Sequence, residues 1–155
     1  MTKFLLSVHV LAAIIAVGPV TVAASMFPAA TRRALAAPGQ EREVAVLRTL
    51  HRVCRVYAAI GIAVPAFGLA AGSSLGVLGD PWLVVSMVLT ALAAATLVLL
   101  ILPRQTEVLD AVTAADHPVP ARLPARLAMH TGVFNLLWAT VTVLMVVRPG
   151  STTGA

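Results

Sequence analysis

The sequence predicts an all-α integral membrane protein, folded as an up-down bundle of four transmembrane helices. Of its 155 residues, 59% are hydrophobic and only 11% are charged, and the mean hydropathy is +0.95. Soluble domains carry about 25% charged residues, so this chain has too few charges to cover a water-soluble globule. Four apolar stretches also reach the ~20 residues that a membrane-spanning helix needs. Basic residues concentrate in the segments between alternate stretches, which indicates a common side for those segments.

This composition excludes an ordinary cytosolic enzyme and a nucleic-acid-binding domain. The formal charge of +5 and the pI near 11.1 are typical of a membrane protein with arginine-rich cytoplasmic loops. We therefore expect phospholipid, and no nucleic acid, among its partners. Cys54 is the one cysteine of the chain, so an intrachain disulfide and a CxxC site are both excluded.

The four predicted spans lie in a single domain that covers residues 1–155. They occupy residues 4–27, 53–78, 82–102 and 127–147. The first span follows Lys3 and is much longer than the 7–15 apolar residues of a signal peptide. We therefore expect it to be retained as a helix rather than cleaved.

The basic residues predict the orientation. Nine of the eleven lysines and arginines fall in the connecting segments 28–52 and 103–126 or just inside the second span. They are Arg32, Arg33, Arg42, Arg48, Arg52, Arg55, Arg104, Arg122 and Arg126. The positive-inside rule makes both segments cytoplasmic and places Lys3, Arg148 and both termini outside. The expected location is the cytoplasmic (inner) membrane of a bacterium.

Both cytoplasmic segments contain further helix. In the run EREVAVLRTLHR, the apolar residues Val44, Leu47 and Leu50 recur every third position, so the second helix begins near Glu41. After the third span, Pro103 begins a short polar helix whose Val108 and Leu109 lie at the membrane interface.

The second span carries a stripe of small residues, Gly68, Gly72 and Gly76, spaced four apart. Such a stripe lets another backbone approach closely. Its partner is either a helix of the same bundle or a second copy of the chain in a homodimer. Pro19 and Pro65 each remove one helical N–H, and we expect them to bend the first and second spans.

Three side chains predict a site in the outer half of the bundle. His9 lies in the first span, Met87 in the third and Met145 in the fourth, all toward their outer ends. An imidazole with thioether sulfurs suits copper, and also suits an axial haem ligand pair. In the alternative, His9 is a neutral hydrogen-bonding residue and the methionines are apolar filler.

A second candidate group lies toward the cytoplasmic ends. His51 and His130 are near the starts of the second and fourth spans, at similar depth, as a bis-histidine haem b site requires. Arg52 and its neighbouring arginines would then pair with haem propionates. The alternative is an arginine–histidine belt that holds phospholipid headgroups.

Two further polar residues have structural interpretations. Asn135, about halfway along the fourth span, is predicted to hydrogen-bond to another helix. Cys54 is predicted to be a small buried residue. The spans hold no carboxylate, which argues against a proton relay built on buried acids, and no hydrolase or ATPase motif occurs.

The segments LLSVHVLAAIIAVGP, LPRQTEVLDAV and VLMVVRPG together resemble a bacterial four-span integral membrane family of unknown function. That family is distantly similar to the copper-resistance D proteins and to HemJ-type protoporphyrinogen oxidases, whose first helix carries a histidine in its outer part. The matching position is His9, so the resemblance implies metal or haem handling there. The chain departs from the HemJ type after the first span, where it reads GPVTVAASMFPAATRR and lacks the aromatic-Gly-Gly-Leu-Phe run.

The leading functional hypothesis is a small membrane protein that binds haem or copper through transmembrane histidines, for redox or metal handling. The alternatives are a non-catalytic accessory subunit of a larger membrane complex and a lipid- or quinone-binding bundle. No catalytic residue and no specific reaction is predicted.

Overall fold

The computed structural model describes residues 2–114 and 119–150 of the chain, and this part is helical apart from short connections. The elements are α1 Thr2–Ala36, α2 Glu41–Ile60, α3 Ala63–Leu75, α4 Pro81–Ala95, the π-helix η1 Thr96–Ile101, α5 Leu102–Ala114 and α6 Leu123–Val147. In the described part, 4 helices are long and apolar enough to cross a membrane. They are Thr2–Ala36, Glu41–Leu75, Pro81–Ala114 and Leu123–Val147. The predicted all-α fold with four spanning helices is confirmed.

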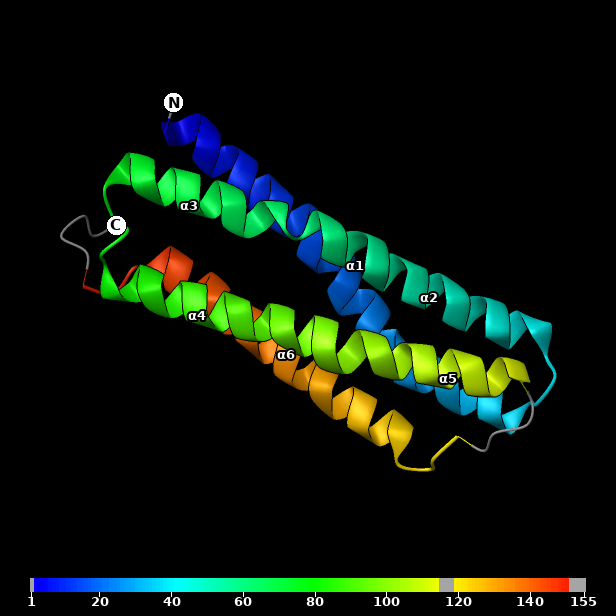
Figure 1. The fold of residues 1–155 in the computed structure, drawn as a ribbon. Helices are drawn as coiled ribbons and strands as arrows, with labels where there is room; N and C mark the ends of the chain where they lie inside the picture. Colours follow the sequence, from blue (N-terminus) through cyan, green and yellow to red (C-terminus); the bar gives the residue numbers. More distant parts are fainter. Residues whose placement is uncertain (1, 115–118, 151–155) are drawn as a thin grey trace.

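The four long helices run up and down (Figure 1). The start of α1, the α3–α4 turn and the end of α6 lie at one end, and the α1–α2 connection lies at the other. The first helix is central, because α1 packs against α2, α3 and α6 and also touches α5. The helix α4 lies further out and packs mainly against α6. The predicted up-down order therefore holds in the structure.

The helices extend well beyond the predicted spans. The first continues to Ala36, and the second begins at Glu41, as its apolar spacing predicted. Between them the chain turns at Gly39, whose φ of +82° is accessible to glycine at little cost. Much of the predicted connecting segments 28–52 and 103–126 is thus helix that projects past the apolar stretches.

The polar helix expected after Pro103 is not separate. It is α5, joined without a break to α4 through η1. Pro103 has no N–H to donate to the carbonyl of Leu99, and the π-helix, with its wider turn, ends at Ile101, two residues before this proline. The third long helix therefore crosses Pro103 and runs on to Ala114.

The π-helix sets which face of the third helix is buried. Ala93, Leu97, Ile101 and Gln105 are all buried and recur every fourth residue. A regular α-helix with 3.6 residues per turn would rotate such a series off one face. The extra width of η1 corrects this rotation, so Gln105 of α5 stays in line with the buried apolar residues.

The second long helix is interrupted at Gly61–Ile62, between α2 and α3. Pro65 lies one turn further on and cannot donate to the carbonyl of Gly61, which instead accepts the N–H of Val64 at 3.1 Å. The helix is thus interrupted one turn before Pro65, and the predicted bend itself stays a prediction. Pro19, in contrast, lies within the uninterrupted helix α1.

The core forms two clusters along the bundle. One, near the α1–α2 connection, centres on Phe27, Leu47 and Val108. The other lies at mid-bundle around Cys54, Ile101 and Phe134. Toward the opposite end, the first residue of α1 to be buried is Ala16, so the turns that precede it are less covered by the rest of the chain.

Candidate functional site

His9 lies on α1 and faces α3. Its Nδ1 is 2.9 Å from the carbonyl oxygen of Val64. Because a carbonyl oxygen only accepts hydrogen bonds, Nδ1 must carry the proton and donate it. In the neutral imidazole, Nε2 then keeps its lone pair. The acceptor for this part-buried imidazole is thus a backbone carbonyl of the second long helix.

Gly68 makes room for this imidazole. A Cβ added at Gly68 would lie 2.9 Å from Cε1 of His9 and 3.1 Å from Nδ1. Any larger residue would displace the ring, so the glycine is what allows His9 to reach Val64. The spacing of His9, Val64 and Gly68 in the sequence gives no sign of this arrangement.

The three glycines of the predicted stripe have different surroundings. Gly68 faces His9, and a Cβ at Gly72 would lie 3.1 Å from side-chain atoms of both Leu78 and Leu83. Gly76 ends α3 with a φ of +71° and meets nothing within 4 Å. Gly68 and Gly72 are therefore covered within one chain, as the intramolecular alternative predicts, and the homodimer stays a prediction.

The two predicted methionine ligands lie on the α4–α6 helix pair, whereas the His9 side chain lies between α1 and α3. Met87 is on α4 and Met145 on α6, which pack against each other, and both side chains are half-buried. His9 contacts α3 instead. The two sulfurs thus share a helix pair, and their joint ligation with His9 stays a prediction.

A buried polar chain links α2 to α5. Nδ1 of His51 lies 3.0 Å from Oε1 of Gln105, and Nε2 of Gln105 lies 3.6 Å from Sγ of Cys54. Gln105 and Cys54 are fully buried. The interpretation of Cys54 as a small buried residue is confirmed. Gln105 was not singled out from the sequence, although its spacing of four after Ile101 and three before Val108 is the available signal.

His51, like His9, has its Nδ1 directed at an oxygen. Since the amide nitrogen of Gln105 is directed at Cys54, its oxygen is the acceptor for His51. Arg52, the next residue, is exposed. Its predicted pairing with a haem propionate stays a prediction.

His130 lies on α6, which contacts α1, α4, η1 and α5. Its Nδ1 is buried and has no hydrogen-bond partner in the described part of the chain. Arg104 and Arg126 are close enough to His130 for their charges to act on its imidazole. His51 and His130 are thus on helices that both contact α1 and α5, and a bis-histidine site between them stays a prediction.

Asn135 links α6 to α1, because its Nδ2 donates to Oγ of Ser25 over 3.1 Å. The predicted interhelical hydrogen bond is confirmed. Oδ1 of Asn135 and Nε1 of Trp138 are buried without partners in residues 2–114 and 119–150. Asn135 and Trp138 are three residues apart, about one helical turn, on the helix that also carries His130.

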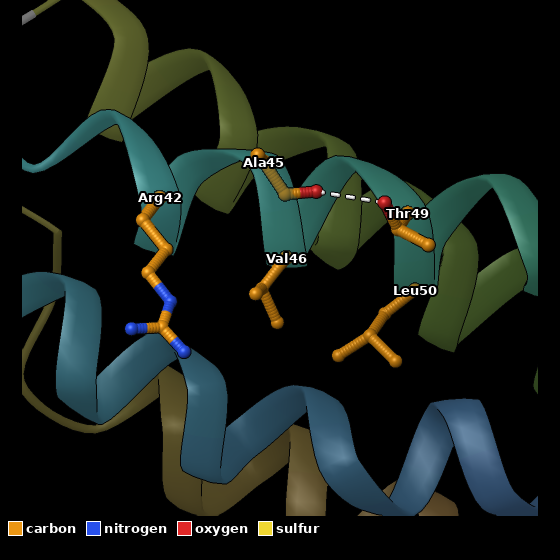
Figure 2. Close-up of a pocket in the computed structure, with 5 residues that line it drawn as sticks. All are labelled: Arg42, Ala45, Val46, Thr49 and Leu50. Atoms are coloured by element: carbon orange, nitrogen blue, oxygen red, sulfur yellow. Dashed lines mark hydrogen bonds between the residues drawn. The ribbon is translucent and has the colours of Figure 1, made fainter.

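A hollow of about 290 Å³ lies on α2, lined by Arg42, Ala45, Val46, Thr49 and Leu50. Figure 2 shows Arg42, Val46 and Leu50 extending toward the neighbouring helix, while the Thr49 hydroxyl bonds its own helix at the Ala45 carbonyl. Its wall is mostly apolar and it holds none of the predicted histidines.

The described residues contain no group of three or more His, Cys, Asp or Glu side chains that could hold a metal ion. A metal bound by these side chains would therefore have one or two of them as ligands, with the remaining positions filled by other groups. Haem needs the fewest protein ligands, because its porphyrin supplies four nitrogens to the iron.

Comparison with known proteins agrees with this architecture. No curated protein and no solved structure matches the chain. The family model described as "Predicted integral membrane protein (DUF2269)" matches residues 3–149, which include all of the four long helices except Thr2. The chain belongs to this family of integral membrane proteins.

Proposed function

We propose that this membrane protein binds a redox-active metal cofactor, haem b or copper, with His9 as a ligand. The observation that carries the proposal is the hydrogen bond from Nδ1 of His9 to the Val64 carbonyl. Metal-binding histidines characteristically donate their second ring N–H to a carbonyl or carboxylate, which fixes the ring and the tautomer. Here Nε2 is the nitrogen left to bind a metal.

The setting of the ring also supports this role. Holding an imidazole against Gly68 fixes its direction before any ligand arrives, and a rigid ligand loses less entropy on binding. His9 lies in the part of α1 before Ala16, where the chain covers its own helix least. The ring is only part-buried, so a cofactor can approach it from outside the chain.

The donor set favours haem over copper. Copper bound by protein side chains alone needs further donors beside His9, and the two methionines lie on the α4–α6 pair. Haem needs one axial imidazole and takes its other donors from the porphyrin. When bound, it would supply one-electron redox chemistry at the membrane.

An absorption spectrum and a metal analysis of the purified protein test the proposal. The expected result is a Soret band with haem in about equal molar amount to the protein, or copper in that amount without the band. Protein that contains neither after expression with added haem precursor and copper would overturn the proposal and favour the accessory-subunit hypothesis.

A further inference from the structure

A positively charged hollow lies toward the end of the bundle opposite His9, and two of its arginines, Arg104 and Arg126, act on the nearby His130. This hollow of about 390 Å³ opens between α5 and the start of α6. Arg104 of α5, Arg122 directly before α6 and Arg126 of α6 line it, together with one carboxylate, Glu107. Three guanidinium groups against one carboxylate leave a positive hollow, and a guanidinium binds phosphate oxygens through paired hydrogen bonds.

The start of α6 adds to this positive charge. Arg122 is the residue before the first turn of the helix, and Pro124 in that turn has no N–H. The N–H of Leu123 already donates to the Pro120 carbonyl, so the positive end of the helix dipole is what favours an anion here. Arg126, one turn further along, reaches the same hollow.

The hollow lies at the boundary of the apolar segments. The third apolar stretch ends at Leu102, two residues before Arg104, and the fourth begins at Leu127, directly after Arg126. In a membrane, the three arginines therefore lie at the depth of the lipid phosphates, and they lie on the predicted cytoplasmic side, where anionic lipids attract basic residues.

An apolar track continues from the arginines toward the membrane centre. On α6, Met129 and Val133 follow Arg122 and Arg126 at helical spacing and are 59% and 45% exposed. On the third helix, Leu100 precedes Arg104 by four residues and is also exposed. A phosphate held by the arginines would thus have apolar surface beneath it on both helices. Acyl chains attached to that phosphate could pack on this surface, whereas a free phosphate ion would make no contact with it.

We infer that this hollow binds the phosphate of an anionic phospholipid, with Arg104, Arg122 and Arg126 on the headgroup and the acyl chains along Leu100, Met129 and Val133. The lipid would join α5 to α6 at the end of the bundle where few of their residues touch. This site is independent of any cofactor at His9.

The test is a thermal-unfolding titration of the full chain in detergent with phosphatidylglycerol, with phosphatidylcholine and with inorganic phosphate. Phosphatidylglycerol should raise the unfolding temperature of the wild-type protein more than the other two. The variant Arg104→Gln/Arg126→Gln should bind it more weakly, by about fivefold for each charge removed. The matched control Arg42→Gln removes an arginine from the other hollow and should bind it as the wild type does.

If the double variant does not fold, Arg122→Gln replaces it in the test. Arg122 is exposed and lies before the first turn of α6, so this change should not prevent folding. Equal stabilisation by inorganic phosphate, lost in the same variants, would show a free-anion site and overturn the lipid assignment. Binding of phosphatidylglycerol that is unchanged in Arg122→Gln and in the double variant would overturn the site itself.

Discussion

The imidazole of His9 and the backbone carbonyl of Val64 are joined by a hydrogen bond of 2.9 Å that connects α1 to α3. Val64 lies directly before Pro65, at the start of the helix that follows the Gly61–Ile62 break. The contact thus joins the first long helix to the segment where the second is interrupted. It also fixes the tautomer of the one titratable side chain in the first apolar stretch.

Gly68→Ala should displace the imidazole of His9 while the histidine itself is kept. The added Cβ would lie 2.9 Å from the imidazole, so the ring must move and its bond to Val64 weakens. We expect a loss of about 1–3 kcal/mol in the free energy of unfolding, measured by thermal unfolding in detergent. Gly18→Ala on α1 is the control, because its Cβ meets nothing within 4 Å. Equal stability of the two variants would contradict the close contact between Gly68 and the His9 imidazole.

Gly72→Leu should destabilise the bundle rather than separate two chains. Leu78 and Leu83 already lie 3.1 Å from a Cβ at this position, and a leucine would need space that they occupy. Overpacking of this kind costs typically about 1–3 kcal/mol. Size-exclusion chromatography and thermal unfolding of the same sample check this. A fully stable variant that shifts from dimer to monomer would instead favour the homodimer.

Gln105→Leu should loosen the contact between α2 and α5. The change removes the acceptor of His51 and the donor to Cys54 at a fully buried position. We expect a loss of about 1–3 kcal/mol for the partner left without a hydrogen bond. The rate at which a membrane-permeant reagent alkylates Cys54 should rise, since the thiol is buried in the wild type. Cys54→Ala should be milder, because the sulfur bond is the weaker of the two.

Impermeant thiol labelling of intact cells tests the orientation. In a Cys54→Ala background, a cysteine at Ser73 or Ser74, near the α3–α4 turn, should react. A cysteine at Ala36, at the end of α1, should not, because the positive-inside rule makes that end cytoplasmic. The reverse pattern of labelling would contradict the orientation and exchange the leaflets assigned to both ends.

The sequence predicted the architecture because hydropathy and charge act over whole segments. Twenty apolar residues identify a span whichever neighbour they contact, and the spacing of Val44, Leu47 and Leu50 was enough to begin α2 at Glu41. Asn135 was equally predictable, since an amide in a membrane helix needs a partner.

The contacts within the bundle were not predictable in this way. The π-helix brings Gln105 onto the buried face, and the run TLVLLI that forms it has no feature to distinguish it from ordinary helix. The seat of His9 depends on which helix lies beside α1. Tertiary packing determines which helix lies beside α1, and the periodicity of a single helix does not predict that packing.

The cofactor content of His9→Ala, measured beside the wild type by absorption spectroscopy and metal analysis, decides whether His9 holds the cofactor. Alanine is well tolerated in an apolar helix, so the variant should fold, and thermal unfolding of the same sample verifies this. Arg42→Gln, a change on α2, is the control and should keep the cofactor. We predict that His9→Ala loses the bound haem or copper while it remains folded. A folded His9→Ala protein with the full wild-type cofactor content would contradict this prediction.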